Sequence, residues 1–254
     1  MKKIVLIVIG CLYLAAHLSA QDSDGSKFRF GVQASPTWSW LKSDVPYLEN
    51  SGSNWGLKLS FMVEKYFQPN FALTSGIGFG FNHGGTILSR YSNYHPWLAS
   101  DLSVTINESD SLSLPDKSKL HYRLRYVEVP VGGKILFGSG EDSNLQFYAE
   151  PVITLGFLTQ AFGDIRGAGS KLDAVDQNIR EDVNGLSLSW GFGAGVEYAV
   201  SGRTSLVGGF FYQNQFTDIT QKARARTDSN GQWADEKAKT SFRSVTLRIG
   251  VITN

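Results

Sequence analysis

Cysteine is almost missing from this chain of 254 residues, and neither charge sign is in excess. The single cysteine, Cys11, lies in the first apolar stretch, so the rest of the chain offers no disulfide, thiol nucleophile or thiolate ligand. The 24 Lys and Arg residues balance 23 Asp and Glu residues, for a formal net charge of +1. Nucleic-acid binding would require a basic excess, so no nucleic-acid partner is expected.

Long apolar runs are also scarce, and the only one lies at residues 4–16, directly after two lysines. A basic start, a short apolar run and small residues at 19–20 are typical of a secretory signal peptide. We therefore predict a signal peptide at residues 1–20 and a single mature domain at residues 21–254. A lipoprotein signal ending at Cys11 is the alternative, although the apolar run continues past that cysteine.

What the chain does have is strict alternation of apolar and polar residues. In residues 28–40 every even position is apolar or proline, and every odd position is polar, charged or glycine. A period of two places one set on each face of a β-strand. We predict eight such strands, at residues 28–40, 55–67, 70–82, 120–137, 144–158, 186–200, 203–216 and 240–252.

The connections between these strands alternate between short and long. Short turns are expected at 68–70, 138–143 and 201–202, where residues suited to tight turns occur. The long polar connections are 41–54, 83–119, 159–185 and 217–239. The pattern predicts an all-β fold, an eight-stranded antiparallel up-and-down transmembrane β-barrel with long extracellular loops and short periplasmic turns.

Two alternatives to this topology stay open. A hairpin at residues 102–114 could enter the wall and make ten strands, and a soluble β-sandwich would share the gross composition. Asn230-Gly231 is a strong hairpin signal and predicts a ribbon within the last long connection. Prolines at 36, 130 and 151 remove ladder donors and predict bulges at these points.

Aromatic residues gather at both ends of the predicted strands, as expected where rings lie at headgroup level. The long-loop ends carry four tryptophans, Trp38, Trp40, Trp55 and Trp190. The short-turn ends carry Tyr66, Phe67, Phe71, Phe137, Phe147 and Tyr198. These two groups predict an aromatic belt at each surface of an outer membrane, whose lipids are the expected partners.

The opposite face of the strands carries charges, which alternation directs into the lumen. The predicted inward residues are Lys58, Glu64, Glu128, Lys134, Glu150, Glu197 and Arg248. Eight strands leave an interior just wide enough for side chains to fill, so these charges are expected to pair and close the lumen. A proton path or a ligand site is the alternative. Glycines at 76, 78, 80, 191, 193 and 195 predict inward stripes that make room there.

The strand at 120–137 departs from this regular pattern. Its apolar face includes Val127 and Val129, but the same phase upstream holds His121, Arg123 and Arg125. Either residues 120–125 stand above the bilayer, or a bulge exchanges the faces, because arginine facing lipid is costly.

No constellation of residues predicts catalysis, a cofactor or a metal. His83, His95 and His121 lie in or beside the longest loop, but their spacing fits no ligand motif. Lys222, Arg224 and Arg226 alternate on one face and could bind lipopolysaccharide phosphates or form a solvated ribbon face.

The segment Tyr126-Val127-Glu128-Val129-Pro130-Val131-Gly132-Gly133-Lys134 resembles the Tyr-Leu-Glu-Ile-Pro-Leu-x-x-Lys signature of PorT-like outer-membrane β-barrel proteins. Phe147-Tyr148-Ala149-Glu150-Pro151 and the Ala20-Gln21 cleavage site are also similar to that group. The resemblance covers residues 28–252 and implies an eight-stranded outer-membrane barrel. The family's name member serves type IX secretion, and its motif supplies no catalytic residues. This chain ends on Asn254 rather than on the aromatic residue common in porin-type barrels.

These patterns favour a non-enzymatic integral barrel whose loops contact a partner or assist secretion or envelope assembly. Other envelope or secretion proteins are the expected protein partners. A small-solute channel and a lipid-modifying enzyme with a histidine base at the outer rim are the alternatives.

Overall fold

A computed structural model describes most of the chain downstream of residue 27. The described residues are 28–90, 94–95, 97, 99–100, 102, 114–138, 144–169, 173–220, 225–227, 233–235 and 238–254. The predicted signal peptide lies outside them. No helix among the described residues is long and apolar enough to cross a membrane.

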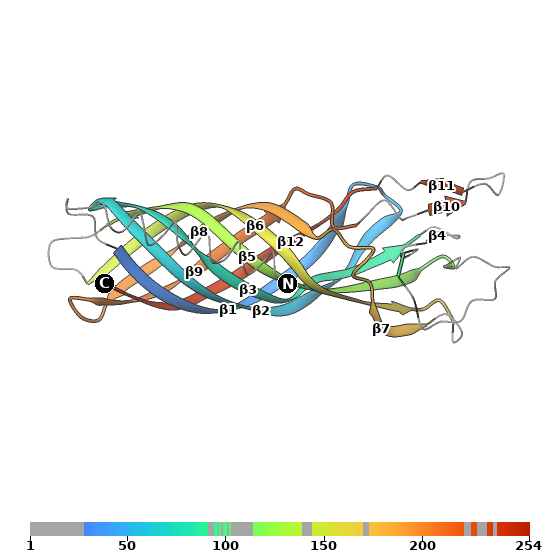
Figure 1. Ribbon diagram of the computed structural model, residues 1–254, viewed down its shortest axis with the longest axis horizontal. Helices are drawn as coiled ribbons and strands as arrows, with labels where there is room; N and C mark the ends of the chain where they lie inside the picture. Colours follow the sequence, from blue (N-terminus) through green and yellow to red (C-terminus); the bar gives the residue numbers. More distant parts are fainter. Residues whose placement is uncertain are drawn as a thin grey trace, which may run out of the picture.

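Eight long antiparallel strands close into a ring (Figure 1). They are β1 (Phe28–Ser43), β2 (Leu48–Gln68), β3 (Phe71–Ser89), β5 (Ser118–Phe137), β6 (Leu145–Arg166), β8 (Leu186–Ala199), β9 (Thr204–Gln215) and β12 (Thr240–Thr253). The order is β5-β3-β2-β1-β12-β9-β8-β6, and pairing of β5 with β6 closes the ring. Each wall strand therefore has two hydrogen-bonded neighbours, so the ring has no open edge.

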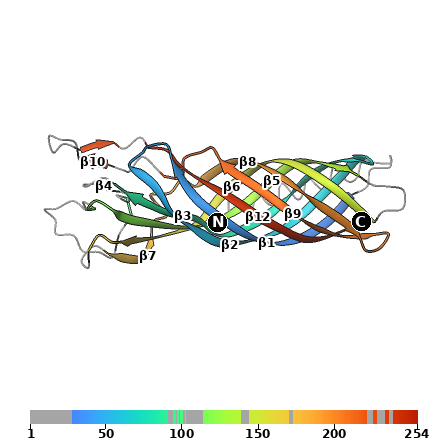
Figure 2. The same ribbon diagram turned by 180° about the vertical axis from the view of Figure 1, so that it is seen from behind.

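Four short strands lie outside this ring, all at the end opposite the C-terminus (Figures 1 and 2). β7 (Ala174–Asn178) pairs with the far end of β6. β4 (Tyr94–His95), β10 (Ala225–Thr227) and β11 (Trp233–Asp235) form a separate sheet. The eight predicted wall strands are confirmed, and the ten-strand alternative is wrong because no further described strand enters the ring.

The β10–β11 pair confirms a hairpin in the last long connection, since Thr227 lies opposite Trp233. The Asn230-Gly231 dipeptide itself lies outside the described residues, as does most of the predicted hairpin at 102–114. The first long connection is much shorter than predicted. β1 ends at Ser43 and β2 begins at Leu48, so residues 44–47 alone join these two strands.

The three prolines do not cause the bulges predicted from them. Pro36, Pro130 and Pro151 each keep the register of their strand pair, lying opposite Leu57, Thr154 and Phe192. Each proline lacks an N–H, so it can omit a single donor without displacing its neighbours in the ladder.

Among the bulges that do occur, two lie on β3 and β6, the strands that flank β5. β3 has one extra residue between Gly80 and His83, and Asn82 there adopts a φ of 60°. β6 has an extra residue at Thr159, whose hydroxyl donates to the Arg125 carbonyl at 3.1 Å. Because the side-chain period is two, each extra residue exchanges the inward and outward faces of its strand.

β5 itself has no bulge and keeps one phase throughout. Leu120, Tyr122, Leu124 and Tyr126 point inward, in the same phase as Glu128. The bulge alternative for this strand is therefore wrong. Arg123 and Arg125 stay on the outer wall, beyond the lipid-facing valines of the same strand.

Inward residues at the long-loop end form an apolar core, and we call this core, together with the strand ends and connections around it, the head. Its buried members are Leu41, Leu48, Ile87, Trp97, Leu114, Leu120, Tyr122, Leu124, Tyr126, Leu158, Ala161, Ile165, Ala168, Ile179, Val183, Ile219, Ala238 and Phe242. They come from wall strands and from connections far apart in sequence, and burial of their apolar surface stabilises the head. The lumen is therefore covered by packed hydrocarbon at this end.

Candidate functional site

The lumen is the site to which the sequence directs its charged residues. All seven predicted residues point inward and are largely buried. An eighth charge, Arg29 on β1, joins them and is not among the predicted residues. Its odd position, in phase with Gln33 and Ser35, was the available signal. With Arg29 the lumen holds four bases and four acids, so the charges balance.

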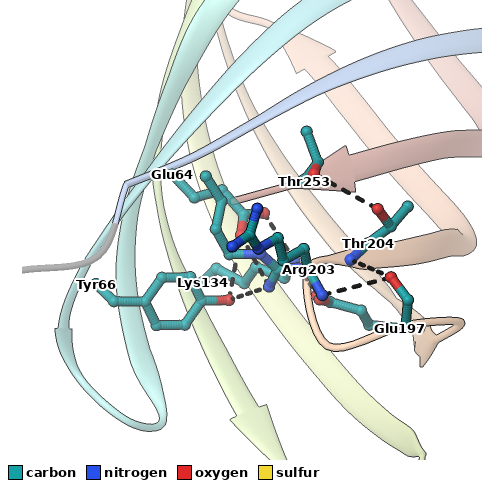
Figure 3. Close-up of polar contacts among 9 residues, drawn as sticks. Glu64, Tyr66, Lys134, Glu197, Arg203, Thr204 and Thr253 are labelled. Atoms are coloured by element: carbon teal, nitrogen blue, oxygen red, sulfur yellow. Dashed lines mark hydrogen bonds and ion pairs between the residues drawn. The ribbon is translucent and has the colours of Figure 1, made fainter.

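The layer nearest the short turns surrounds Lys134 (Figure 3). The Lys134 ammonium lies 2.7 Å from carboxylate oxygens of both Glu64 and Glu197. Arg29 forms an ion pair with Glu197 and donates to the Tyr66 hydroxyl at 3.0 Å. The Tyr66 hydroxyl in turn donates to Glu64 at 3.1 Å. Tyr66 thus belongs to the lumen, and its predicted place in the lipid-facing belt is wrong.

The middle layer joins opposite walls of the barrel. Arg248 on β12 pairs with Glu150 on β6, and β8 and β9 lie between these strands. Thr74 donates to the other Glu150 oxygen at 2.7 Å, while the Arg248 guanidinium lies 4.2 Å from the Phe211 ring centroid. The carboxylate is therefore held by a cation and a hydroxyl, as a buried charge requires.

The third layer lies nearer the head and is built around Lys58. Its ammonium lies 2.8 Å from Glu128 and donates to Gln213 at 2.5 Å. The Gln213 amide donates to the Ser189 hydroxyl at 2.7 Å. Lys58 is on β2 and Gln213 is on β9, so this contact also spans the lumen.

A cavity of about 60 Å³ remains between the middle and third layers. Its lining includes Lys58, Glu128, Glu150 and Arg248. A water needs roughly 10–15 Å³ by this measure, so the cavity has room for a few waters.

Glycines provide the space for large inward side chains. Gly80 faces the His83 imidazole, and Gly191 faces the Phe211 ring, so a side chain at either glycine would displace the ring. The predicted inward glycine stripes are confirmed at these two positions. The His83 ring lies 5.4 Å from Phe242 and 6.2 Å from Tyr126, between centroids, at the floor of the head.

The histidines do not assemble a metal site in the described part of the chain. His83 is buried inside, whereas His121 lies on the outer wall with its Nδ1 2.9 Å from the Thr86 hydroxyl. Nothing is described of the His95 side chain. No group of three His, Cys, Asp or Glu residues that could hold a metal occurs among the described residues.

Thr86 and His121 also fail to form a catalytic triad. Asp164 lies opposite His121 on β6, but its carboxylate accepts from Arg123 at 2.8 Å and from the Asp176 N–H at 2.9 Å. No described carboxylate is hydrogen-bonded to the imidazole. Burial lowers the pKa of His121, and Arg123 and Arg166 add to this effect while Asp164 opposes it.

The outer wall of the ring is apolar. Trp38, Trp55 and Trp190 are exposed on it, and the first two stack with centroids 5.2 Å apart. Trp40 is partly buried in the same region. At the short-turn end the exposed rings are those of Phe67, Phe71, Phe137, Phe147 and Tyr198.

A family model for the outer membrane protein beta-barrel domain matches residues 19–247. The chain belongs to this family. It is an integral barrel of the bacterial outer membrane, so its apolar wall faces lipid and the sandwich alternative is wrong. In barrels of this kind the short turns are periplasmic and the long connections are extracellular, which places the head outside the cell.

No curated protein matches this outer-membrane barrel. Among solved structures, Neisserial surface protein A matches at 15% identity and a TM-score of 0.44, over 91% of this chain and 99% of that one. OprG of Pseudomonas aeruginosa matches at 10% identity and 0.43, over 90% and 95%. A major outer membrane protein of Thermus thermophilus matches at 15% identity and 0.42, over 89% and 99%. These scores are too low to bear on function.

Proposed function

We propose that this barrel is a non-enzymatic, non-conducting scaffold that presents its head to a protein partner of the envelope. The observation that carries the proposal is the head itself. β3 and β5 pair from Gly84 and Arg123 to Ser89 and Ser118, beyond the tryptophan belt. A barrel that only spans lipid needs no apolar core outside the membrane.

The lumen supports the non-conducting part of the proposal. Three polar layers cross it, and the buried rings of Tyr126 and Phe242 lie above them. Purified barrel in planar bilayers is expected to give no single-channel steps. Reproducible steps that persist in independent preparations would support the small-solute channel instead.

Crosslinking in intact cells tests the partner. Val175 on β7 is 59% exposed on the head, and Phe210 is 65% exposed on the lipid-facing wall. A photo-reactive residue at Val175 is expected to capture one defined envelope protein, whereas the same residue at Phe210 captures none. If no protein is captured at Val175 or at further exposed positions of the head, the proposal of a protein partner is contradicted.

The PorT-like resemblance makes protein secretion the narrower proposal. It rests on residues 126–134, of which Glu128 and Lys134 bind other lumen residues in this structure. A deletion strain is then expected to lose secreted proteins from its medium and retain them in the periplasm. If the set of secreted proteins is unchanged, the proposed role in secretion is rejected, while the proposal of a protein partner is unaffected.

A further inference from the structure

A groove of about 360 Å³ lies on the outer wall of the head. Its lining comes from four adjacent strands, β2, β3, β5 and β6, and consists of Ser51, Thr86, Lys119, His121 and Arg166. The register of β2 and β3 shifts between Asn50 and Gly52, which places Ser51 in a bulge. Every lining side chain can donate a hydrogen bond, and none is a carboxylate.

Two like charges face each other in this groove. Lys119 and Arg166 are direct partners across the β5–β6 ladder, an arrangement that repels. Lys119 has no carboxylate partner among the described residues. Arg166 reaches Asp164 only at 3.4 Å, and Arg123 already binds that carboxylate at 2.8 Å. An anion between Lys119 and Arg166 would convert their repulsion into attraction.

The height of the groove above the tryptophan belt indicates where that anion comes from. Arg125 on β5 lies beside the bulge of β3 that contains Asn82. The Asn82 amide donates to the Trp55 carbonyl at 2.6 Å, so Arg125 lies near the level of Trp55. His121 and Lys119 come four and six residues before Arg125 on β5, toward the head. For a tilted strand this is roughly 10–15 Å above the belt, within the polar zone of a glycolipid leaflet. The groove faces sideways, toward neighbouring lipids.

We infer that this groove binds a phosphate group carried by the polar head of an outer-leaflet glycolipid. Lys119 and Arg166 supply the two charges, and Ser51 supplies a hydroxyl donor. The Thr86 hydroxyl, 2.9 Å from His121 Nδ1, supplies a second one when the imidazole donates in that hydrogen bond. Charge-assisted hydrogen bonds from such groups are the strong contacts in phosphate recognition. The lipid would fix the tilt and depth of the head, whether or not a protein partner binds it.

The test uses the full mature barrel folded in micelles and titrated with bis-phosphorylated lipid A. Wild-type barrel is expected to bind it, and the double variant Lys119→Gln/Arg166→Gln to bind at least about tenfold more weakly. Both side chains are exposed, so the variant is expected to fold, which the mobility shift of heated against unheated barrel on gels verifies. Arg203→Gln is the matched control, because Arg203 is exposed in the turn between β8 and β9, at the short-turn end of the barrel away from the groove.

Several outcomes would overturn the inference. Equal binding by the wild type and the double variant, or an equal loss in Arg203→Gln, would leave only non-specific charge attraction. Equal binding of dephosphorylated lipid A would remove phosphate as the recognised group. Inorganic phosphate that binds as tightly as lipid A would show a free-phosphate site and exclude the lipid source.

Discussion

Arg248 on β12 pairs with Glu150 on β6 across the lumen, with two strands between them on the wall. The pair resists separation because each charge lies in a largely closed interior. Thr74 donates to the carboxylate at 2.7 Å, and Phe211 covers the guanidinium. Ion pairs between non-adjacent strands add contacts across the lumen to the ladder hydrogen bonds that close the ring.

Replacing one member of this pair is expected to destabilise the barrel strongly. Arg248→Ala leaves Glu150 charged and buried, so the free energy of unfolding should fall by about 3–5 kcal/mol. Denaturant unfolding in lipid vesicles measures this change. The double variant Arg248→Met/Glu150→Gln should recover much of the loss, and a double variant as unstable as Arg248→Ala would contradict the explanation.

The head core is expected to behave like the interior of a water-soluble domain. Leu124 is fully buried there, so Leu124→Ala should cost about 2–5 kcal/mol through lost burial and a residual cavity. Leu59→Ala is the matched control, because Leu59 faces lipid and acyl chains can fill the space. Hydrogen exchange of β5 measures the effect. Equal losses of protection in the two variants would contradict a separate packed core.

The tryptophan positions are expected to be distinguishable by lipid quenching. Trp190 is exposed on the lipid-facing wall, whereas Trp97 is buried in the head and donates to the Tyr122 hydroxyl at 3.2 Å. Single-tryptophan variants in vesicles of brominated lipid should show strong quenching of Trp190 and little of Trp97. Comparable quenching of both would place the head within the bilayer and reject the assigned height.

Stability of the head is expected to fall as the pH drops below about 6.5. The pKa of His121 is lowered from 6.5 in the folded head, chiefly by burial, so the unfolded head takes up a proton first. Above its unfolded pKa, His121 is neutral in both states and its contribution to the stability of the head is complete. As the pH falls toward the lower folded pKa, protonation of the unfolded state removes this contribution. Hydrogen exchange of β5 and β6 should show this loss, and His121→Gln should flatten it. An unchanged profile in that variant would assign the pH dependence to another group.

The period-two alternation by itself determined the wall of this protein. Strand positions, the lipid face, the lumen face and the seven inward charges follow from local geometry, because alternate side chains on a strand must point to opposite sides. The positions of Trp38, Trp40, Trp55 and Trp190 follow equally, since each lies in phase with the apolar face of its own strand. For the same reason Arg29 was readable from its odd position on β1.

Tertiary structure alone decided which charges meet and what covers the lumen. Lys134 contacts Glu64 and Glu197 only because closure brings three separate strands together. The bulges at Asn82 and Thr159 exchange faces on β3 and β6, and a repeating pattern cannot indicate where one extra residue will be accommodated. The head follows the same principle. Isolated apolar residues such as Leu114, Ile179 and Ile219 lie in connections that look polar in sequence, and they form a core only when the folded barrel places them together.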